Sequence, residues 1–168
     1  MQEKLRRHYQ IQKEVSRGGK FQGKIGLGNL GRLTGFLLSD RSDIDVEFSF
    51  SQSDYDLPMV EGQLQARLTI ECQRCLEAME LPVNIDFQLL VSPPGSDVTE
   101  SSLDTVISEN GSVDIFAVVE DELILGLPLV TMHEDIACNE FLQAQEVDSE
   151  PTTEENPFSV LSKLKTTH

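Results

Sequence analysis

Apolar and polar residues alternate along three segments in the middle of the chain. These segments cover residues 45–50, 63–72 and 83–91, and in each of them apolar residues occupy every second position. A period of two gives a β-strand one apolar face and one wet face, which is typical of an antiparallel sheet covered on one side. The chain is therefore predicted to hold a mostly antiparallel β-sheet.

A helical spacing follows these strands. Asp114 suits the N-cap of a helix, and apolar residues then recur at helical intervals over residues 115–125 until Gly126 ends the pattern. We expect this helix to pack on the sheet, which makes the fold class α+β. Three consecutive acids in this helix point in different directions, so we expect them on a solvated face rather than in a catalytic pair: Glu120, Asp121 and Glu122.

Shorter signals surround these elements. Residues 5–15 are predicted to form a polar helix, and the glycine-rich residues 18–35 favour turns and bent strands over a helix. Val106 and Ile107 indicate a short strand before the turn signal Asn110-Gly111.

The C-terminal part of the chain differs from the rest in composition. Residues 140–155 hold several acids, no Lys or Arg and few large apolar side chains, which predicts an acidic flexible linker. Asn156 and Pro157 then suit the first positions of a short helix over 156–165. We expect its apolar residues to dock on the domain or on a partner: Phe158, Leu161 and Leu164.

These patterns divide the chain into four parts. A basic N-terminal arm covers residues 1–24, and a single α+β domain covers residues 25–139. The acidic linker at 140–155 and the short C-terminal helix at 156–165 follow it.

Charge is distributed very unevenly between the two ends of the chain. The formal net charge is −16, yet residues 1–41 hold nine basic and three acidic residues, a balance of +6. The basic end could contact phosphates, whereas the acidic remainder could attract a basic protein. The candidate RNA-binding residues are Lys4, Arg6, Arg7, Lys13, Arg17, Lys20, Lys24 and, between two cysteines, Arg74.

The three cysteines and one histidine form the main candidate for site chemistry. Cys72 and Cys75 form a Cys-x-x-Cys in the predicted connection between the second and third strands, with Cys72 continuing the buried face. His133 and Cys138 could complete a tetrahedral zinc site with this pair, although their separation is not diagnostic. We expect ordinary buried or surface thiols and no cofactor, and we keep zinc on these four residues as the alternative. Redox chemistry is disfavoured because the pair lies in a hairpin loop without a strand-to-helix setting.

Composition also bears on the compartment. No apolar run approaches the ~20 residues that cross a bilayer, and an odd number of cysteines argues against a disulfide framework. We therefore expect a cytoplasmic protein without a membrane partner.

Several motifs together resemble the YceD family, the large ribosomal RNA subunit accumulation proteins. The resemblance covers roughly residues 30–165 and implies a role in the synthesis, processing or stability of 23S ribosomal RNA during large-subunit assembly. It also implies a non-enzymatic protein without a small-molecule substrate, and we interpret the chain as bacterial. The matching residues are Ile70-Glu-Cys-Gln-Arg-Cys-Leu76, Asp114 with 119–128, His133, Cys138 and 156–165.

Two hypotheses about the mechanism follow. In the first, the basic arm binds ribosomal RNA or a pre-ribosomal particle directly. In the second, the protein is an acidic chaperone or adaptor for a basic ribosomal protein, with residues 140–155 and the acidic body imitating nucleic acid.

Overall fold

The computed structural model describes residues 5–54, 56–96 and 103–139. Within these ranges, seven strands and two helices occur together with three short 3₁₀ turns. The strands are β1 (His8–Gln10), β2 (Lys20–Gly26), β3 (Asp43–Gln52), β4 (Pro58–Glu71), β5 (Ala78–Ser92), β6 (Asp104–Ile107) and β7 (Ser112–Asp114). The helices are α1 (Ile11–Ser16) and α2 (Ile115–Gly126), and the 3₁₀ turns are Leu27–Asn29, Leu33–Phe36 and Ile136–Cys138.

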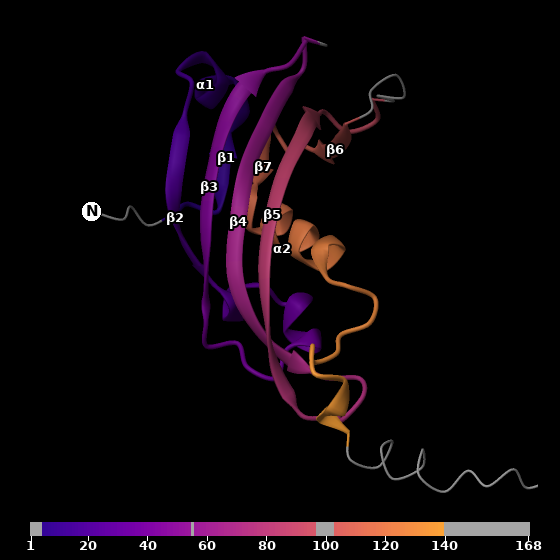
Figure 1. Cartoon of the computed structure of the whole chain (residues 1–168). Helices are drawn as coiled ribbons and strands as arrows, with labels where there is room; N and C mark the ends of the chain where they lie inside the picture. Colours follow the sequence, from indigo (N-terminus) through magenta and orange to yellow (C-terminus); the bar gives the residue numbers. More distant parts are fainter. Residues whose placement is uncertain (1–4, 55, 97–102, 140–168) are drawn as a thin grey trace, which may run out of the picture. The chain divides into compact units, whose positions relative to one another are not determined.

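A five-stranded sheet forms the main element of the fold. Its strand order is β2-β3-β4-β5-β6, and every neighbouring pair is antiparallel except β5 and β6, which run parallel. A separate two-stranded sheet pairs β1 with β7. Figure 1 shows this small sheet and α2 on one face of the large sheet. The α+β architecture with a mostly antiparallel sheet is as predicted.

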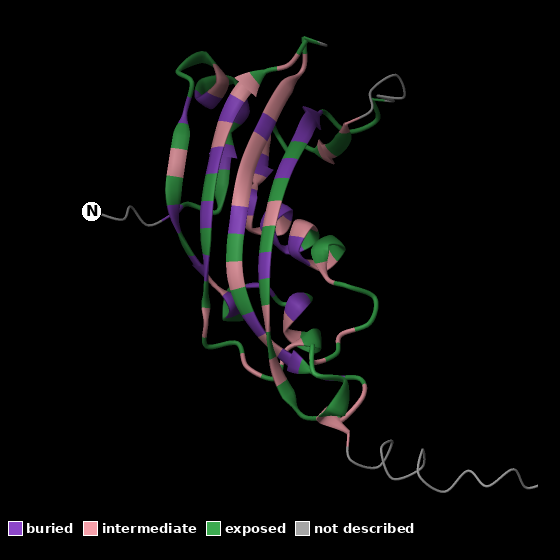
Figure 2. Cartoon of the chain, in the orientation of Figure 1, coloured by how far each residue is buried: buried purple, intermediate pink, exposed green. Residues whose placement is uncertain are grey.

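The core lies between the large sheet and the elements that cover it. Buried and exposed residues alternate along β3 (Figure 2). Val46 and Phe48 are buried, whereas Asp45 and Glu47 are exposed. α2 contributes buried residues from its inner face: Ile115, Val118, Val119 and Leu123. Each such side chain contributes roughly 1.5–3 kcal/mol to folding, so burial of this face holds the helix on the sheet.

The predicted helix at residues 115–125 is confirmed together with its cap. An Asp114 carboxylate oxygen accepts hydrogen bonds from the amides of Phe116 and Ala117, at 3.0 and 3.2 Å. The predicted Asn110-Gly111 turn precedes it, and both residues have positive φ (52° and 71°). A tight turn of this kind requires positive φ at both central residues, which asparagine and glycine adopt readily. Asn110 and Gly111 therefore connect Glu109 to β7, and Glu109 forms an isolated β-bridge with Ser112.

The N-terminal segment is folded into this body. Residues 5–24, expected as a basic arm, supply β1, α1 and most of β2. Tyr9 is only 2% exposed and packs edge-on against Phe21 and Phe48, with ring centroids 4.6 and 5.3 Å away. Phe50 lies 5.9 Å from Tyr9 and completes an aromatic cluster that anchors the segment.

Two local predictions are wrong. Residues 5–15 were expected as one helix, but His8–Gln10 forms β1 and only Ile11–Ser16 is helical, because pairing with β7 competes with helix formation. Glu120 was expected on a solvated face, but it is 8% exposed and binds the 3₁₀ turn that begins at Leu33. The predicted short strand at Val106 and Ile107 is confirmed as β6, although it pairs parallel to β5.

Several predicted features lie outside the described residues. They are Lys4, the acidic linker at 140–155 and the C-terminal helix at 156–165 with Phe158, Leu161 and Leu164. No helix in the described ranges is long and apolar enough to cross a membrane.

Candidate functional site

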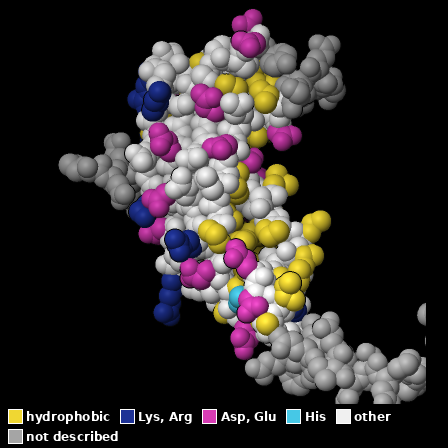
Figure 3. Space-filling model, viewed as in Figure 1, with side chains coloured by type: hydrophobic (Ala, Val, Ile, Leu, Met, Phe, Trp, Pro, Cys, Tyr) yellow, Lys and Arg dark blue, Asp and Glu magenta, His cyan; other side chains and the backbone are white. Residues whose placement is uncertain are grey.

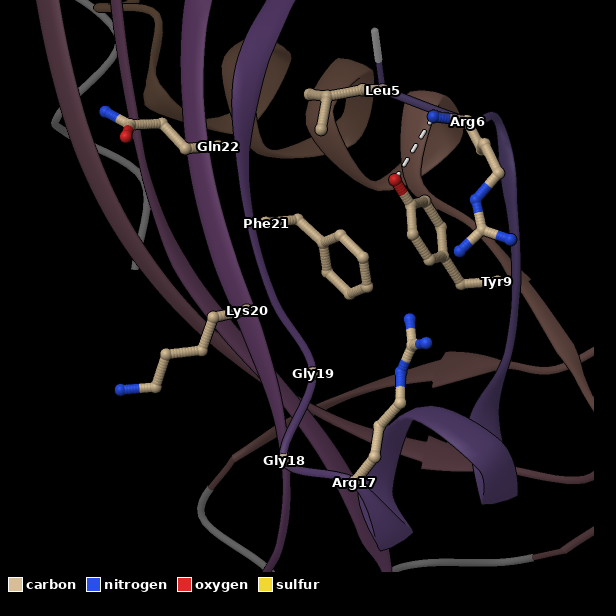
Figure 4. Close-up of a pocket in the computed structure, with 9 residues that line it drawn as sticks. All are labelled: Leu5, Arg6, Tyr9, Arg17, Gly18, Gly19, Lys20, Phe21 and Gln22. Atoms are coloured by element: carbon tan, nitrogen blue, oxygen red, sulfur yellow. Dashed lines mark hydrogen bonds between the residues drawn. The ribbon is translucent and has the colours of Figure 1, made fainter. Parts of the chain in front are cut away.

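A hollow of about 560 Å³ lies where β1, the end of α1 and the start of β2 meet. We call it the basic pocket, and Figure 4 shows its lining. Arg6 reaches it from the segment before β1 and Arg17 from the end of α1, and both side chains lie beside the rings of Tyr9 and Phe21 (Figure 4). The remaining lining residues are Leu5, Gly18, Gly19, Lys20 and Gln22.

A buried carboxylate positions the two arginines. Glu14 on α1 is 1% exposed, and its oxygens accept from Arg6 Nη2 at 3.4 Å and from Arg17 Nε at 2.5 Å. A side chain at Gly19 would place its Cβ 2.7 Å from Glu14 Oε2, so the carboxylate would have to shift from its present position to accommodate it. Glu14 therefore fixes both guanidinium groups while offering only one negative charge against two positive ones.

Aromatic rings support the same two side chains. The Arg6 guanidinium lies 4.7 Å from the centroid of the Tyr9 ring, and the Arg17 guanidinium lies 5.6 Å from that of Phe21. The Arg6 amide also donates to the Tyr9 hydroxyl at 3.1 Å. The arginine side chains remain 59% and 47% exposed, so they are held in place and still accessible to a ligand.

The other predicted RNA-binding residues lie at different places. Lys13 and Lys20 are exposed on α1 and β2, and the Lys20 side chain points away from the rings (Figure 4). Arg7 donates to Asp114 at 2.9 Å, and Lys24 pairs with Asp45 at 3.1 Å. The structure thus brings Arg6 and Arg17 together and engages Arg7 and Lys24 with carboxylates.

Arg74 is distant from the basic pocket. It lies in the loop between β4 and β5, at the opposite end of the sheet from α1 (Figure 1). Its guanidinium group donates to the sulfur of Met132 at 3.4 Å. This contact therefore lies at the cysteine-bearing loop and not at the basic pocket.

The basic pocket has the chemistry of an anion site. A planar guanidinium group presents paired N–H donors that match the oxygens of a phosphate, and both groups here keep exposed edges. Phe21 is half-buried, so part of its ring is open to solvent beside Arg17. Guanidinium groups next to aromatic rings are the combination that binds phosphates and stacks bases of single-stranded RNA.

The loop with Cys72 and Cys75 connects β4 to β5, as predicted. We call residues 72–77 the cysteine loop. Cys72 is fully buried, its amide donates to the Glu77 carbonyl at 2.9 Å, and its own carbonyl accepts from the Leu76 amide at 2.8 Å. Cys75 is half-buried, and none of the three cysteines forms a disulfide.

The chain after α2 runs along the cysteine loop. The Thr131 hydroxyl donates to the Glu71 carbonyl at 2.9 Å, and the Gln73 amide donates to the Thr131 carbonyl at 2.8 Å. Together with the contact between Arg74 and Met132, these bonds fix residues 131–132 beside the loop.

His133 and Cys138 belong to the short segment that follows. Both are half-buried, and Cys138 ends the 3₁₀ turn Ile136–Cys138. Asp135 caps this turn, since its carboxylate accepts from the Ala137 amide at 2.8 Å and its carbonyl accepts from the Cys138 amide at 3.2 Å.

A second hollow is mainly apolar. It lies between the 3₁₀ turn Leu33–Phe36, the end of β4 and the chain after α2, and we call it the apolar groove. Several of its residues are exposed although they are large and hydrophobic: Phe36 at 59%, Leu38 at 54% and Leu129 at 98%. Figure 3 shows hydrophobic side chains gathered over α2 and the chain after it, with acidic side chains nearby.

Charged contacts connect α2 to the 3₁₀ turn Leu33–Phe36, which borders this groove. Arg32 Nε pairs with Glu120 at 3.0 Å, and the Leu33 amide donates to Glu120 at 3.2 Å. Burial raises the pKa of Glu120, but the hydrogen bonds from Arg32 and from the Leu33 amide outweigh it and lower the pKa overall. Burial, followed by repulsion from the carboxylates of Asp104 and Asp121, raises the pKa of Glu122.

Sequence reasoning missed the residues that organise the basic pocket. Glu14 is an isolated acid among basic residues, and only its place three residues before Arg17 signals a pair. Tyr9 and Phe21 carry no strand periodicity that would distinguish them from other core residues. Their role arises from contacts made across the fold.

The fold defines a small α+β protein in which two helices and a two-stranded sheet accompany a mostly antiparallel five-stranded sheet. Sequence comparison then identifies the family. The chain belongs to the family of large ribosomal RNA subunit accumulation proteins YceD, whose sequence model matches residues 60–165.

A curated relative supports the same assignment over most of the chain. The large ribosomal RNA subunit accumulation protein YceD of Haemophilus influenzae is 32% identical over 161 residues, which cover 91% of this chain and 91% of the relative. No solved structure matches the chain. The family name implies a role in the accumulation of large-subunit ribosomal RNA, and the resemblance drawn from the motifs is confirmed.

Proposed function

We propose that this protein supports large-subunit assembly by binding ribosomal RNA through the basic pocket, as a non-enzymatic factor in the cytoplasm. The observation that carries this proposal is the convergence of Arg6 and Arg17 on one hollow beside aromatic rings. The family's link to large-subunit RNA supplies the class of ligand.

The distribution of charge supports a single RNA-facing end. Arg74 is the only Lys or Arg in residues 68–139, whereas six Lys or Arg residues lie in the short stretch 5–24. The acidic remainder repels phosphates, so RNA is favoured at the end that holds the basic pocket. Lys13 and Lys20, which are exposed near this end, extend the positive surface.

The test removes the charges of the pocket without leaving a buried carboxylate unpaired. The triple variant R6Q/E14Q/R17Q keeps polar partners at all three positions and changes the net charge by −1. Because each lost phosphate contact with single-stranded RNA reduces the salt slope by about 0.7, we expect a slope that is shallower by about 1.4. The measurement is the affinity for fragments of 23S ribosomal RNA over a range of salt concentrations.

R67Q is the matched control, because it also changes the net charge by −1 and Arg67 is 80% exposed outside the pocket. We expect it to bind RNA with the slope of the unmodified protein. Equal loss of affinity in both variants would show a general charge effect and would contradict the pocket assignment, as would unchanged binding in a folded triple variant.

The apolar groove favours a second candidate function, that of a chaperone or adaptor for a basic ribosomal protein. An exposed apolar surface of this kind marks a binding site, and Leu129 is almost wholly exposed. Glu71 lines the groove, and no Lys or Arg occurs in residues 103–139, so a basic partner suits the charge around it.

Crosslinking in growing cells separates the two functions, because RNA and protein partners are recovered from the same sample. Recovery of ribosomal RNA that depends on Arg6 and Arg17 supports the first function. Recovery of one basic ribosomal protein without RNA, lost in the variant F36S/L129S, supports the second and overturns the first.

A further inference from the structure

We infer that the basic pocket binds one unpaired nucleotide of RNA, whose base stacks over the Arg17 guanidinium group while Arg6 binds its phosphate. The ligand is therefore single-stranded RNA and not a duplex. This inference rests on the proposed RNA-binding function, which it deepens by naming the form of the RNA. The side chains that carry it lie in residues 5–21 and in β3.

A series of planar groups leads from the core to the surface of the pocket. The Phe21 ring stacks on the Phe48 ring, with centroids 5.2 Å apart and ring planes inclined by 27°. The Arg17 guanidinium group lies over the Phe21 ring, 5.6 Å from its centroid. Exposure increases along this series, because Phe48 is buried, Phe21 is half-buried and the Arg17 side chain is 47% exposed. The series therefore ends at an accessible guanidinium plane, and unpaired bases stack on such planes as they do on aromatic rings.

Glu14 fixes the orientation of this guanidinium plane. Its carboxylate accepts a hydrogen bond from Arg17 Nε at 2.5 Å and also pairs with Arg17 Nη2, so both contacts lie on one edge of the plane. Because Glu14 is 1% exposed, the carboxylate is itself held in place by its surroundings. A planar group that is fixed by its edge keeps its face for stacking, and little side-chain entropy is lost when a base binds there.

Arg6 supplies donors for the phosphate. Its guanidinium group lies 4.7 Å from the centroid of the Tyr9 ring and contacts Glu14 through Nη2 at 3.4 Å. The two guanidinium groups share this one carboxylate, so one positive charge remains for one phosphate. Figure 4 shows both guanidinium groups beside the Tyr9 ring. A phosphate on Arg6 and a base on Arg17 therefore lie side by side, as they do within a nucleotide.

The size of the pocket also favours an unpaired nucleotide. Its volume of about 560 Å³ falls within the range of roughly 300–1,000 Å³ that is usual for small-ligand sites. Bases inside an A-form duplex are paired and stacked on their neighbours, and the duplex offers a protein mainly its phosphates and 2′-hydroxyl groups. A duplex can reach the exposed arginines through its phosphates, but only an unpaired nucleotide can place a base on Arg17.

The experiment compares RNA probes on the full-length protein at a fixed salt concentration. The probes are a short unstructured oligonucleotide, its duplex with the complementary strand, and an oligonucleotide of the same length made of abasic nucleotides. Because stacking of a base strengthens binding by roughly 5- to 150-fold, we expect the unstructured probe to bind more tightly than the abasic probe by a factor in that range. We also expect it to bind more tightly than the duplex, whereas a site that recognises charge alone prefers the denser phosphates of the duplex.

The variant R17K separates stacking from charge. Lysine keeps a positive charge beside Glu14 but has no plane on which a base can stack. We expect R17K to lose most of the preference for the unstructured probe over the abasic probe. R67K is the matched control, because it makes the same exchange at a side chain that is 80% exposed outside the pocket. Phe21 is avoided as a test position because its ring packs against the hydrophobic core.

Equal affinity for the unstructured and abasic probes, or tighter binding of the duplex, would overturn the inference. A preference for bases that R17K retains in full would overturn it as well. In each of these cases, loss of RNA binding in R6Q/E14Q/R17Q still supports the proposed function, whereas failure of every RNA probe to bind contradicts both. AMP is the free-nucleotide probe, and binding of AMP as tight as that of the oligonucleotide would assign the pocket to a free nucleotide instead of RNA.

Discussion

Glu14 and Glu120 are two buried carboxylates with the same task at different places in the fold. Glu14 is 1% exposed and binds Arg6 and Arg17, and Glu120 is 8% exposed and binds Arg32. A charge buried in this way destabilises a protein unless it is paired and hydrogen-bonded. Both acids meet this condition and therefore fix the position of the arginines that contact them.

Replacing Glu120 tests this role. The variant E120A leaves the buried Leu33 amide without its acceptor, so the free energy of unfolding should fall by about 2 kcal/mol. Chemical denaturation at neutral pH gives this value. D121A, next to it, removes the same charge and only a solvent-exposed ion pair with Arg32, so it should change stability by less than about 1 kcal/mol. Equal effects of the two variants would contradict the anchoring role.

The dependence of stability on pH follows from the same helix. The folded pKa of Glu120 is lowered from 4.5, so its contribution is present above that value and is lost as the pH falls through the folded pKa. The folded pKa of Glu122 is raised from 4.5, so its contribution is present below that value and is lost as the pH rises.

These signs give opposite predictions for the two glutamine variants. As the pH falls, E120Q should lose less stability than the unmodified protein does. E122Q should raise the melting temperature at neutral pH and leave it unchanged at acidic pH. Melting curves recorded from neutral to acidic pH make the comparison. A lower melting temperature for E122Q at neutral pH would show that the charged form stabilises the fold.

At the scale of the elements, α2 contacts two segments that are separate in the chain: the residues before β1 and the 3₁₀ turn at Leu33. Its N-terminus carries Asp114, which caps the helix and pairs with Arg7 from the segment before β1. Its C-terminal half carries Glu120 and also Ile124, which lines the apolar groove. The helix therefore couples the N-terminal segment to the 3₁₀ turn at Leu33.

Substitutions at Asp114 separate its two contacts. D114A removes the cap and should lower the free energy of unfolding by about 1 kcal/mol. D114S keeps a hydroxyl acceptor for the helix amides and loses only the exposed pair with Arg7, so it should cost much less. Thermal unfolding of both variants gives the comparison, and equal losses would show that the ion pair dominates.

The elements also show what periodicity can predict. The alternation at residues 45–50, 63–72 and 83–91 correctly predicted strands that became β3, β4 and β5, because burial of one face imposes a period of two, but β4 and β5 each begin five residues earlier than predicted. The parallel position of β6 beside β5 could not be predicted, because a four-residue strand carries no signal for its neighbour or its direction.

At the scale of the whole molecule, charge decides which partners can approach. The net charge is −16, but the basic residues are concentrated near β1, α1 and β2. Repulsion of RNA by the acidic remainder acts through solvent and weakens as salt shortens the screening length.

Neutralising acids outside the pocket should therefore strengthen RNA binding only at low salt. D104N/E109Q removes two exposed acids of the region near β6, and we expect tighter RNA binding that converges with the unmodified protein as ionic strength rises. Q65N serves as an uncharged surface control. A gain that persists at high salt would indicate a direct contact instead of a long-range field.

The sequence by itself determined the strands, the capped helix, the hairpin position of the cysteines and the family. These features depend on local periodicity, on capping chemistry and on motifs, all of which are written in neighbouring residues. The candidate metal ligands were also visible from residue type, although their spacing left ordinary thiols as the first interpretation.

Tertiary structure alone decided how distant residues are combined. Arg32 and Glu120 are separated by 88 positions, and Arg7 and Asp114 by 107, so no local pattern pairs them. The basic pocket exists because burial of Tyr9 against the aromatic cluster brings β1 and α1 onto the sheet and directs Arg6 and Arg17 into one hollow. The periodicity of apolar residues determines which face of a strand or helix is buried. Only tertiary packing determines which other element that face contacts.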